Sequence, residues 1–167
     1  MLVESTHQLL HQPATAVTDT QLTDYVNQLK PIASLLIETI IDKNALGISA
    51  CQLGVDMAMF AMLVDDQMRI CINPQIVAAS FTMELMQEGC LSFPNLLLKV
   101  RRPSGVMVRY HNLEGQEITE KLEGLAARVW LHEYDHVNGV CFTDRVGKLS
   151  LNMAKKRLAK KIKRNKK

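Results

Sequence analysis

The sequence predicts an α+β fold in which several short antiparallel strands pack around one central helix. Three observations support this prediction. Apolar residues recur at helical spacing near the start of the chain, short β-type runs alternate with turn residues in the middle, and a second helical pattern lies between Gly124 and Gly139. Strands grouped beside separate helices are typical of the α+β class. A basic segment from about Ser150 onward is expected to form the last helix.

The composition is that of an ordinary globular protein, with 167 residues, 47% hydrophobic and 22% charged. This length fits a single domain, residues 1–167, that buries a core without disulfide bonds. No apolar run approaches the ~20 residues that cross a bilayer. The first residues also lack the basic start and apolar core of a signal peptide. We therefore expect a cytoplasmic monomer that does not contact membranes and keeps its four cysteines reduced.

The apolar pattern near the start of the chain predicts an amphipathic helix that ends at about residue 42. Thr18 and Gln21 have the spacing of a capping box, which stabilises the start of a helix. Pro31 lies inside the pattern. Because proline lacks the N–H that a helix interior needs, we expect it to kink the helix or to divide it in two. The apolar positions are Leu22, Tyr25, Val26, Leu29, Ile32, Ala33, Leu36, Ile37 and Ile40.

The middle of the chain predicts short strands. Asp65-Asp66 and Asn73-Pro74 are turn signals that interrupt the β-type runs, and Asn112–Gly115 has the composition of a hairpin turn. The expected strands are Met57–Val64, Arg69–Ile72, Gln75–Ala79, Phe81–Met86, a strand that contains Val106, Val108 and Tyr110, and Glu117–Leu122.

The second helical pattern carries a His-Glu-x-x-His motif formed by His132, Glu133 and His136. Two histidines four residues apart lie on one face of a helix, one turn apart, so both imidazoles can bind one divalent metal ion. Glu133 is then close enough to contact a water on that ion. The alternative is a pair of core histidines that hydrogen-bond to the backbone. The helical context favours the metal site.

A third protein ligand is expected, because catalytic zinc sites usually have three and leave one position for water. No His follows His136, no Glu follows Glu133, and Asp144 is awkwardly close. The third ligand should therefore come from upstream. Cys90 is the best candidate, since Gly89 before it frees the local backbone, although a single cysteine is more often a core residue.

Three segments together resemble the peptide deformylase family. That family carries, in this order, a Gly/Ala-rich segment that ends in Gln, a Glu-Gly-Cys-Leu-Ser motif and a His-Glu-x-Asp-His motif. The sequence has them at Ala45–Gln52, Glu88–Ser92 and His132–His136. Asn73-Pro74 and the lysine-rich end are also similar to the family. The resemblance extends over about residues 20 to 165.

The resemblance implies a metal-dependent amide hydrolase that removes the formyl group from the N-terminal formyl-methionine of nascent polypeptides and releases formate. It implies one metal ion bound by Cys90, His132 and His136, with water as the fourth ligand. Iron, as Fe²⁺, is implied as the native metal. A thiolate with two imidazoles would also suit Zn²⁺, Ni²⁺ or Co²⁺.

The resemblance also implies roles for the remaining motif residues. Glu133 would be the general base and acid, while the metal, the Gln52 amide and the Leu91 N–H would stabilise the oxyanion. An extended peptide is expected to add as a strand beside a groove. The candidates for substrate binding are Gly47, Ile48 and Gly89 along the groove, and Met86, Leu125 and Val129 around the methionine side chain, where an ordinary core role is equally open.

The first motif departs from the family pattern at two positions. Ala45 replaces the usual first Gly and restricts positive φ, which puts the local loop geometry in question. Ser49 replaces the usual first Ala, and its hydroxyl needs a partner if it is buried. Neither change removes a catalytic group, so we expect the enzyme to be active.

The charge is unevenly distributed. Nine of the 20 basic residues lie in Ala154–Lys167, which has no acidic residue, so the rest of the chain holds 11 basic against 17 acidic residues. The basic segment 155–167 would attract phosphate, and a contact with ribosomal RNA is one interpretation. A solvated, frayed chain end is the other.

Two other functions compete with the deformylase hypothesis. A metalloendopeptidase of another lineage would use His132 and His136 with a third ligand other than Cys90. An RNA-binding module with an inactive site has the least support, because no catalytic position is missing.

Overall fold

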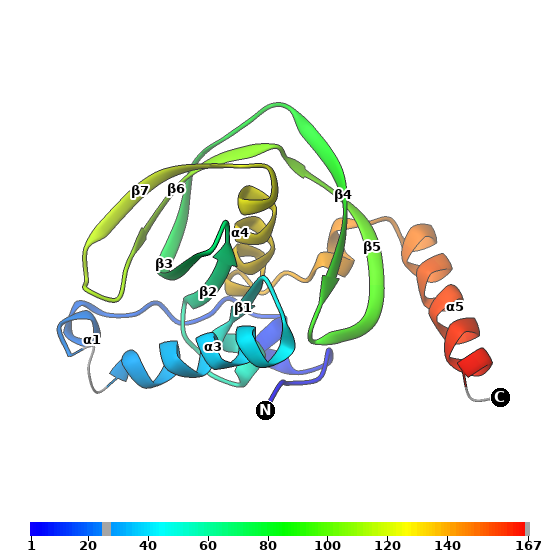
Figure 1. Ribbon diagram of the computed structural model, residues 1–167, viewed down its shortest axis with the longest axis horizontal. Helices are drawn as coiled ribbons and strands as arrows, with labels where there is room; N and C mark the ends of the chain where they lie inside the picture. Colours follow the sequence, from blue (N-terminus) through cyan, green and yellow to red (C-terminus); the bar gives the residue numbers. More distant parts are fainter. Residues whose placement is uncertain (25–27, 166–167) are drawn as a thin grey trace.

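Two antiparallel sheets surround the buried helix α4 (Gly124–Val137) in the computed structural model, which describes residues 1–24 and 28–165. One sheet has five strands in the order β1-β2-β3-β6-β7, and the other pairs β4 with β5. Figure 1 shows the long strands arching around α4. The strands are β1 (Gly47–Ser49), β2 (Met59–Val64), β3 (Gln67–Ala79), β4 (Met83–Cys90), β5 (Phe93–Pro103), β6 (Gly105–His111) and β7 (Glu117–Glu123).

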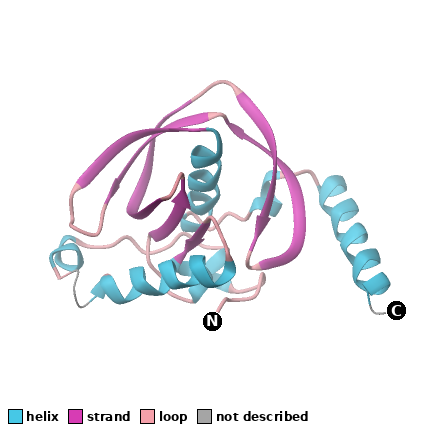
Figure 2. Ribbon diagram, viewed as in Figure 1, coloured by secondary structure: helices cyan, strands magenta, loops and turns pink. Residues whose placement is uncertain are grey.

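The remaining helices lie outside the sheets, as Figure 2 shows by colour. Their bounds are α1 (Asp19–Thr23), α3 (Lys30–Lys43) and α5 (Lys148–Asn165), with short 3-10 helices η1 (Gln8–Leu10), η2 (Ala50–Leu53) and η3 (Phe142–Arg145). The α+β prediction with a central helix is confirmed. In the described part of the chain, no helix combines the length and apolar character that a membrane span requires.

Helix α4 is central because almost its whole surface is apolar or paired. Trp130 is fully buried, and its ring meets Phe60 of β2 edge to face with centroids 5.7 Å apart. Ala126 and Ala127 are small enough for the sheets to approach the helix closely. Because most of its residues are buried between the sheets, α4 presents its two histidines in fixed positions.

The first expected helix is divided, as one of the two interpretations of Pro31 predicted. Thr18 and Gln21 form the capping box of α1. Pro31 lies in the first turn of α3, where a missing N–H leaves no hydrogen bond unmade. Ala33, Leu36 and Ile40 face the core, whereas Tyr25 and Val26 lie outside the described residues.

The prediction of two strands separated by Asn73-Pro74 is wrong, because β3 continues through them. Asn73 takes a positive φ of 50°, and the pairing with β6 shifts register between Ile72 and Gln75. The Asn73-Pro74 pair therefore forms an irregularity within β3 and does not end the strand. The Asn73 side chain also bonds both the N–H and the C=O of Val17, each at 2.8 Å.

The strand β5 was not predicted. Every second residue of its middle part is buried: Leu96, Leu98, Val100 and Arg102. The sequence does not show the usual apolar–polar alternation of a strand, because Leu97 on the outer face is apolar and Arg102 on the inner face is charged. The strand expected at Phe81–Met86 instead runs from Met83 to Cys90. The expected strands ending at Val64 and at Leu122, and the hairpin between β6 and β7, are confirmed within a residue or two.

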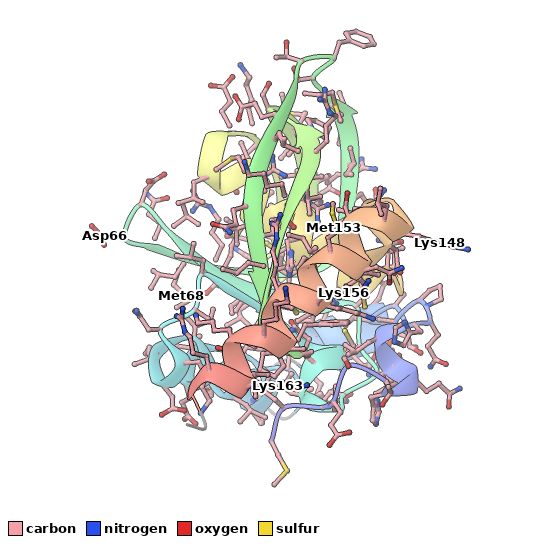
Figure 3. All side chains as sticks on the ribbon, turned by 90° about the vertical axis from the view of Figure 1, so that its right-hand side faces the viewer. Asp66, Met68, Lys148, Met153, Lys156 and Lys163 are labelled. Carbon is pink, nitrogen blue, oxygen red and sulfur yellow. The ribbon has the colours of Figure 1, made fainter. Side chains whose placement is uncertain are left out.

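The basic helix α5 packs against β5 through its first half. Leu151, Ala154 and Leu158 contact a small apolar cluster that contains Leu98 and Phe142. Beyond Leu158 the helix carries mainly basic side chains. Figure 3 shows Lys156 and Lys163 on the side of α5 that faces the viewer.

Candidate metal centre and active site

The structure brings Cys90, His132 and His136 together as a metal site. Cys90 ends β4, while the two histidines lie one turn apart on α4, with ring centroids 5.1 Å apart. Their ligand atoms all lie within 4.8 Å of one another, and Cys90 Sγ is 3.3 Å from His136 Nε2. Both histidines are buried, and Cys90 is half-buried. The upstream cysteine that the sequence suggested is thus the third member of the group.

The donor set fits one tetrahedral divalent ion. Metal–sulfur and metal–nitrogen bonds of about 2.3 and 2.0–2.1 Å place tetrahedral S and N ligands roughly 3.5 Å apart. The 3.3 Å between Cys90 Sγ and His136 Nε2 is close to this value, so a metal would require only a small side-chain adjustment. Burial, as the largest effect, lowers the pKa of His136 well below its usual value, which keeps this imidazole in the neutral form that binds metals.

His132 is oriented by Glu88. The Nδ1 atom of His132 lies 2.9 Å from Glu88 Oε2, which leaves its other ring nitrogen for the metal site. A carboxylate behind a ligand histidine fixes the tautomer and the ring plane. Burial disfavours charge on His132, but hydrogen bonds with Cys90 and Glu88 outweigh it and raise its pKa to about 10 before a metal binds.

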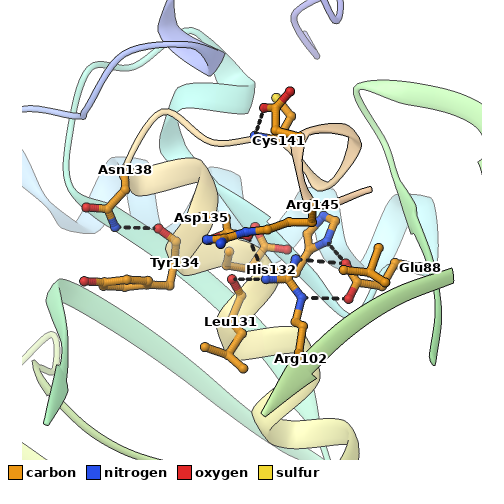
Figure 4. Close-up of polar contacts among 12 residues, drawn as sticks. Glu88, Arg102, Leu131, His132, Tyr134, Asp135, Asn138, Cys141 and Arg145 are labelled. Atoms are coloured by element: carbon orange, nitrogen blue, oxygen red, sulfur yellow. Dashed lines mark hydrogen bonds and ion pairs between the residues drawn. The ribbon is translucent and has the colours of Figure 1, made fainter. Parts of the chain in front are cut away.

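Glu88 belongs to a buried ion-pair network, shown in Figure 4. Arg102 binds both Glu88 oxygens, at 2.7 and 3.0 Å, and reaches Asp135 Oδ2 at 2.7 Å. Arg128 adds a bond of 2.8 Å to Glu88 Oε1, and Arg145 pairs with Asp135 from the solvent side. The network ties β4 and β5 to α4 directly behind the metal ligands. Asp135 is therefore paired with two arginines and is not simply a solvated charge on the helix surface.

Sequence reasoning missed the three arginines of this network. Their partners are 10 to 40 residues away, so no local spacing predicts the pairs. One signal was available. Arg128 lies within the apolar run of α4, where a charged side chain requires a buried partner.

The carboxylate of Glu133 is held by Ser49. Ser49 Oγ donates to Glu133 Oε2 at 2.8 Å and lies 3.2 Å from the Glu133 backbone oxygen. Burial, as the largest effect, raises the pKa of Glu133 above its usual value. A carboxyl group with a raised pKa is suited to accept a proton near neutral pH and to release it again.

The amide of Gln52 points its N–H groups at the metal site. Its Oε1 accepts from the Ser49 backbone N–H at 2.9 Å, which fixes the orientation of the amide. Its Nε2 lies 3.3 Å from Cys90 Sγ and 3.3 Å from Ser92 Oγ. Gln52 is therefore a hydrogen-bond donor immediately beside the ligand cysteine.

A cavity of about 310 Å³ opens onto these groups. One wall comes from β1, the edge strand of the larger sheet, and the segment before it; the facing wall comes from the end of β4, and α4 forms the floor. Of the proposed site residues, the lining contains Gly47, Gly89, Leu91, Leu125 and Val129 together with Gln52, Cys90, His132 and Glu133.

Two proposed substrate residues do not line the cavity. The Ile48 side chain is fully buried in the core on the opposite face of β1, because successive strand residues point to opposite sides. Met86 is half-buried and pairs with Val100 of β5, and the β4 wall begins at Gln87. Ile48 can meet a peptide only through its backbone.

Both departures from the family pattern fit the structure. Ala45 does not need a positive φ, because Asn44 before it, at the end of α3, takes that conformation with φ 49°. Gly47 is the position where an added side chain would collide with the site. A Cβ there would lie 2.6 Å from Glu133 Oε1, closer than such atoms approach.

Comparisons with known proteins agree with this geometry. A family model described as polypeptide deformylase matches residues 1–152. A peptide deformylase from Thermotoga neapolitana is 39% identical over 137 residues, which cover 82% of this chain and 84% of that protein.

Solved structures are similar as well. The crystal structure of peptide deformylase from Thermotoga maritima superposes with a TM-score of 0.82 at 34% identity, covering 88% of this chain and 97% of that one. A Met-Ala-Ser-bound class I type b peptide deformylase from Acinetobacter baumannii gives 0.83 at 28% identity, covering 87% and 97%.

Proposed function

The chain belongs to the polypeptide deformylase family of metal-dependent hydrolases, and on this premise we propose that it removes the formyl group from N-terminal formyl-methionine of nascent polypeptides and releases formate. One observation supports this most strongly. A Cys-His-His metal group, a buried carboxylate and an oriented amide donor lie together, and Cys90, His132, Glu133 and Gln52 line one cavity. Amide hydrolysis needs these three functions: a nucleophile, a proton carrier and an oxyanion donor.

Cys90, His132 and His136 would hold the metal. When bound, a divalent ion lowers the pKa of a coordinated water to about 7, which makes hydroxide available near neutral pH. We propose Fe²⁺ as the native metal, with Zn²⁺, Ni²⁺ and Co²⁺ as substitutes that the same thiolate and imidazoles accept.

Glu133 would transfer the protons of the reaction. Its carboxylate takes a proton from the attacking water and later gives it to the leaving amine. The hydrogen bond from Ser49 and the contact with Gly47 hold the carboxylate in one position through both transfers.

Gln52 and Leu91 would stabilise the oxyanion. The Gln52 amide is already turned so that Nε2 points toward Cys90, and Leu91 directly follows Cys90 and lines the cavity. Donors that are oriented before the reaction need no reorganisation when negative charge develops on the substrate oxygen.

An extended formyl-Met peptide would lie between two strand edges. β1 is an edge strand and β4 belongs to a two-stranded sheet, so a peptide between them can hydrogen-bond to exposed backbone. Leu125 and Val129 of α4 would contact the methionine side chain. The Met-Ala-Ser complex of the Acinetobacter baumannii relative supports this class of substrate.

The metalloendopeptidase alternative requires a third ligand other than Cys90. Cys90 instead stands with both histidines in the metal group, so the geometry favours the deformylase. The test is formate release from formyl-Met-Ala-Ser under anaerobic conditions, with metal analysis of the same sample. We expect one metal ion per chain and formate formation that Glu133→Gln abolishes. Cleavage of internal peptide bonds without formate release would contradict the proposal.

We further propose that the basic segment 155–167 contacts ribosomal RNA and that the enzyme acts as a cytoplasmic monomer. Lys160, Lys161, Lys163 and Arg164 follow the last core contact of α5, so replacing all four by Gln removes charge without removing Leu158 from the core. Ribosome co-sedimentation should fall in this variant and with rising salt. Unchanged co-sedimentation would contradict the contact. Light scattering and cell fractionation test the monomer and its compartment.

A further inference from the structure

Ser49 has an unusual partner. Its side chain is fully buried, where a hydroxyl must find an acceptor, and it finds one in the carboxylate of Glu133 at 2.8 Å. The second acceptor within reach is the backbone oxygen of the same residue, at 3.2 Å. An alanine, which the family pattern has at this position, offers neither bond.

The geometry of β1 explains how one strand controls one carboxylate. Gly47 and Ser49 lie two residues apart and therefore point to the same face of the strand, whereas Ile48 points into the opposite core. Gly47 lets Glu133 Oε1 approach the backbone of β1. Ser49 binds Oε2 of the same carboxylate. Glu133 is thus confined on both oxygens by alternate residues of β1.

Ser49 also controls Gln52 through a different atom. Its backbone N–H donates to Gln52 Oε1 at 2.9 Å, and the amide then points Nε2 toward Cys90. Any residue other than proline would supply this N–H. Two contacts depend on the serine side chain itself: its hydroxyl bond to Glu133, and its part in the capping box of η2, where it faces the Gln52 backbone N–H.

We infer that Ser49 is a positioning residue for the proposed deformylation, acting through Glu133: its hydroxyl holds one carboxylate oxygen, so that the other is kept in the orientation that receives and returns the proton. This inference rests on the proposed function. It assigns to Ser49 an effect on turnover rather than on substrate binding, because Ser49 does not line the cavity. It also predicts that metal binding does not depend on Ser49, since the hydroxyl contacts no metal ligand side chain.

A purely structural role makes a different prediction. If the bond to the Glu133 backbone oxygen only ties β1 to α4, losing it lowers the melting temperature but leaves turnover unchanged well below that temperature. The variants Ser49→Ala, Ser49→Cys and Ser49→Thr separate the two roles. The first removes the hydroxyl, the second replaces it with a weaker donor of similar size, and the third keeps it.

We expect kcat for formyl-Met-Ala-Ser to fall about tenfold in Ser49→Ala, with KM and metal content unchanged. Ser49→Cys should lie between Ser49→Ala and the wild type, and Ser49→Thr should restore turnover if its melting curve shows that it folds. Ile72→Val is the matched control, because Ile72 is fully buried in an apolar cluster and does not line the cavity. It should lose stability without losing turnover.

Two results would overturn the inference. One is a wild-type kcat in Ser49→Ala; the other is an equal fall in kcat in Ser49→Ala and Ile72→Val when both variants lose the same stability. Crystal structures of the wild type and Ser49→Ala give a result that does not depend on activity. We expect one Glu133 conformation in the wild type and several in the variant. An unmoved carboxylate in Ser49→Ala overturns the role of Ser49, whereas a wild type that binds metal but releases no formate overturns only the proposed function.

Discussion

Cys90 Sγ lies 3.3 Å from His136 Nε2, although 46 residues separate the two along the chain. This contact joins the end of β4 to α4 and closes the metal site. Two further contacts hold it in place: the amide of Gln52, from η2, lies beside the cysteine, and the Glu88 network links β4 to α4 behind the histidines. The site therefore depends on the packing of β4 against α4, and not on the helix motif alone.

Replacing the ligand cysteine should remove the metal. Cys90→Ala leaves two histidines, which bind a divalent ion too weakly for catalysis, so we expect metal content and formate release to fall at least a hundredfold. Elemental analysis of the purified protein measures this directly. Cys71→Ala is the control, since Cys71 is a fully buried residue of β3 that is not in the metal group, and this variant should keep its metal. Full metal retention in Cys90→Ala would point to another third ligand.

The cysteines should differ sharply in reactivity. Burial, followed by Asp144, raises the pKa of Cys141 to about 12, and burial raises that of Cys71 well above its usual value. A thiol with a pKa near 12 is only about one part in ten thousand thiolate at pH 8, and that fraction rises about tenfold per pH unit. Iodoacetamide at pH 8 should therefore leave both unmodified in the folded protein.

Cys90 supplies the contrast in the same experiment, because it is only half-buried. Bound metal should protect it, and removal of the metal should add one modification that peptide mapping assigns to Cys90. Modification of Cys141 at pH 8 in the folded protein would show that its environment is more open than the structure indicates.

The sequence predicted the metal site better than its supporting network. His132 and His136 are one helical turn apart, so their meeting depends on local geometry alone. Cys90 was the best upstream candidate for the third ligand, and the family resemblance supported it and added Gln52. Arg102 could not be found in this way, because its partners Glu88 and Asp135 lie 14 and 33 residues away. Long-range ion pairs leave no period in a sequence.

The strands, too, were predicted where local residues determine them and missed where long-range contacts do. The hairpin of β6 and β7 was predicted because a local turn and alternating residues determine it. β5 was missed because its inner face includes Arg102 and its outer face includes Leu97, which cancels the expected polar and apolar alternation. β3 was predicted as two strands because Asn73-Pro74 is a turn signal. The strand continues past it because β3 pairs with β6 on both sides of Asn73-Pro74 and Asn73 is bonded to Ala58 and Val17.

The Glu88 network should contribute both stability and metal affinity. Glu88 is buried; burial disfavours its charge, but the bonds with His132, Arg102 and Arg128 outweigh this and lower the pKa of its carboxyl group below the usual value. Glu88→Gln would leave the two arginines without their shared carboxylate, and breaking a buried pair in this way costs about 3–5 kcal/mol. It would also free the His132 ring.

Two measurements separate these effects. Denaturant unfolding should show the loss of stability, and metal titration should show a loss of affinity of about 10- to 100-fold. Arg145→Gln is a matched control, because Arg145 is half-exposed and, within the described part of the chain, its ion-pair partner is Asp135 at the edge of the network. The Arg145→Gln variant should lose little stability and little metal affinity. A Glu88→Gln variant as stable as the wild type would contradict the importance of the network.

The lack of space for a side chain at Gly47, beside Glu133, gives a steric prediction. A Cβ at Gly47 would lie 2.6 Å from Glu133 Oε1 and 2.9 Å from its Cγ, so the carboxylate must move. Gly47→Ala should therefore lower kcat at least tenfold while the Cys-His-His group, which Gly47 does not touch, still binds metal. Gly147→Ala is the control, because its added methyl group meets nothing within 4 Å. A wild-type rate for Gly47→Ala would contradict this prediction. It would mean that the Glu133 carboxylate works equally well in a displaced position, so that its confinement by β1 plays no part in the reaction.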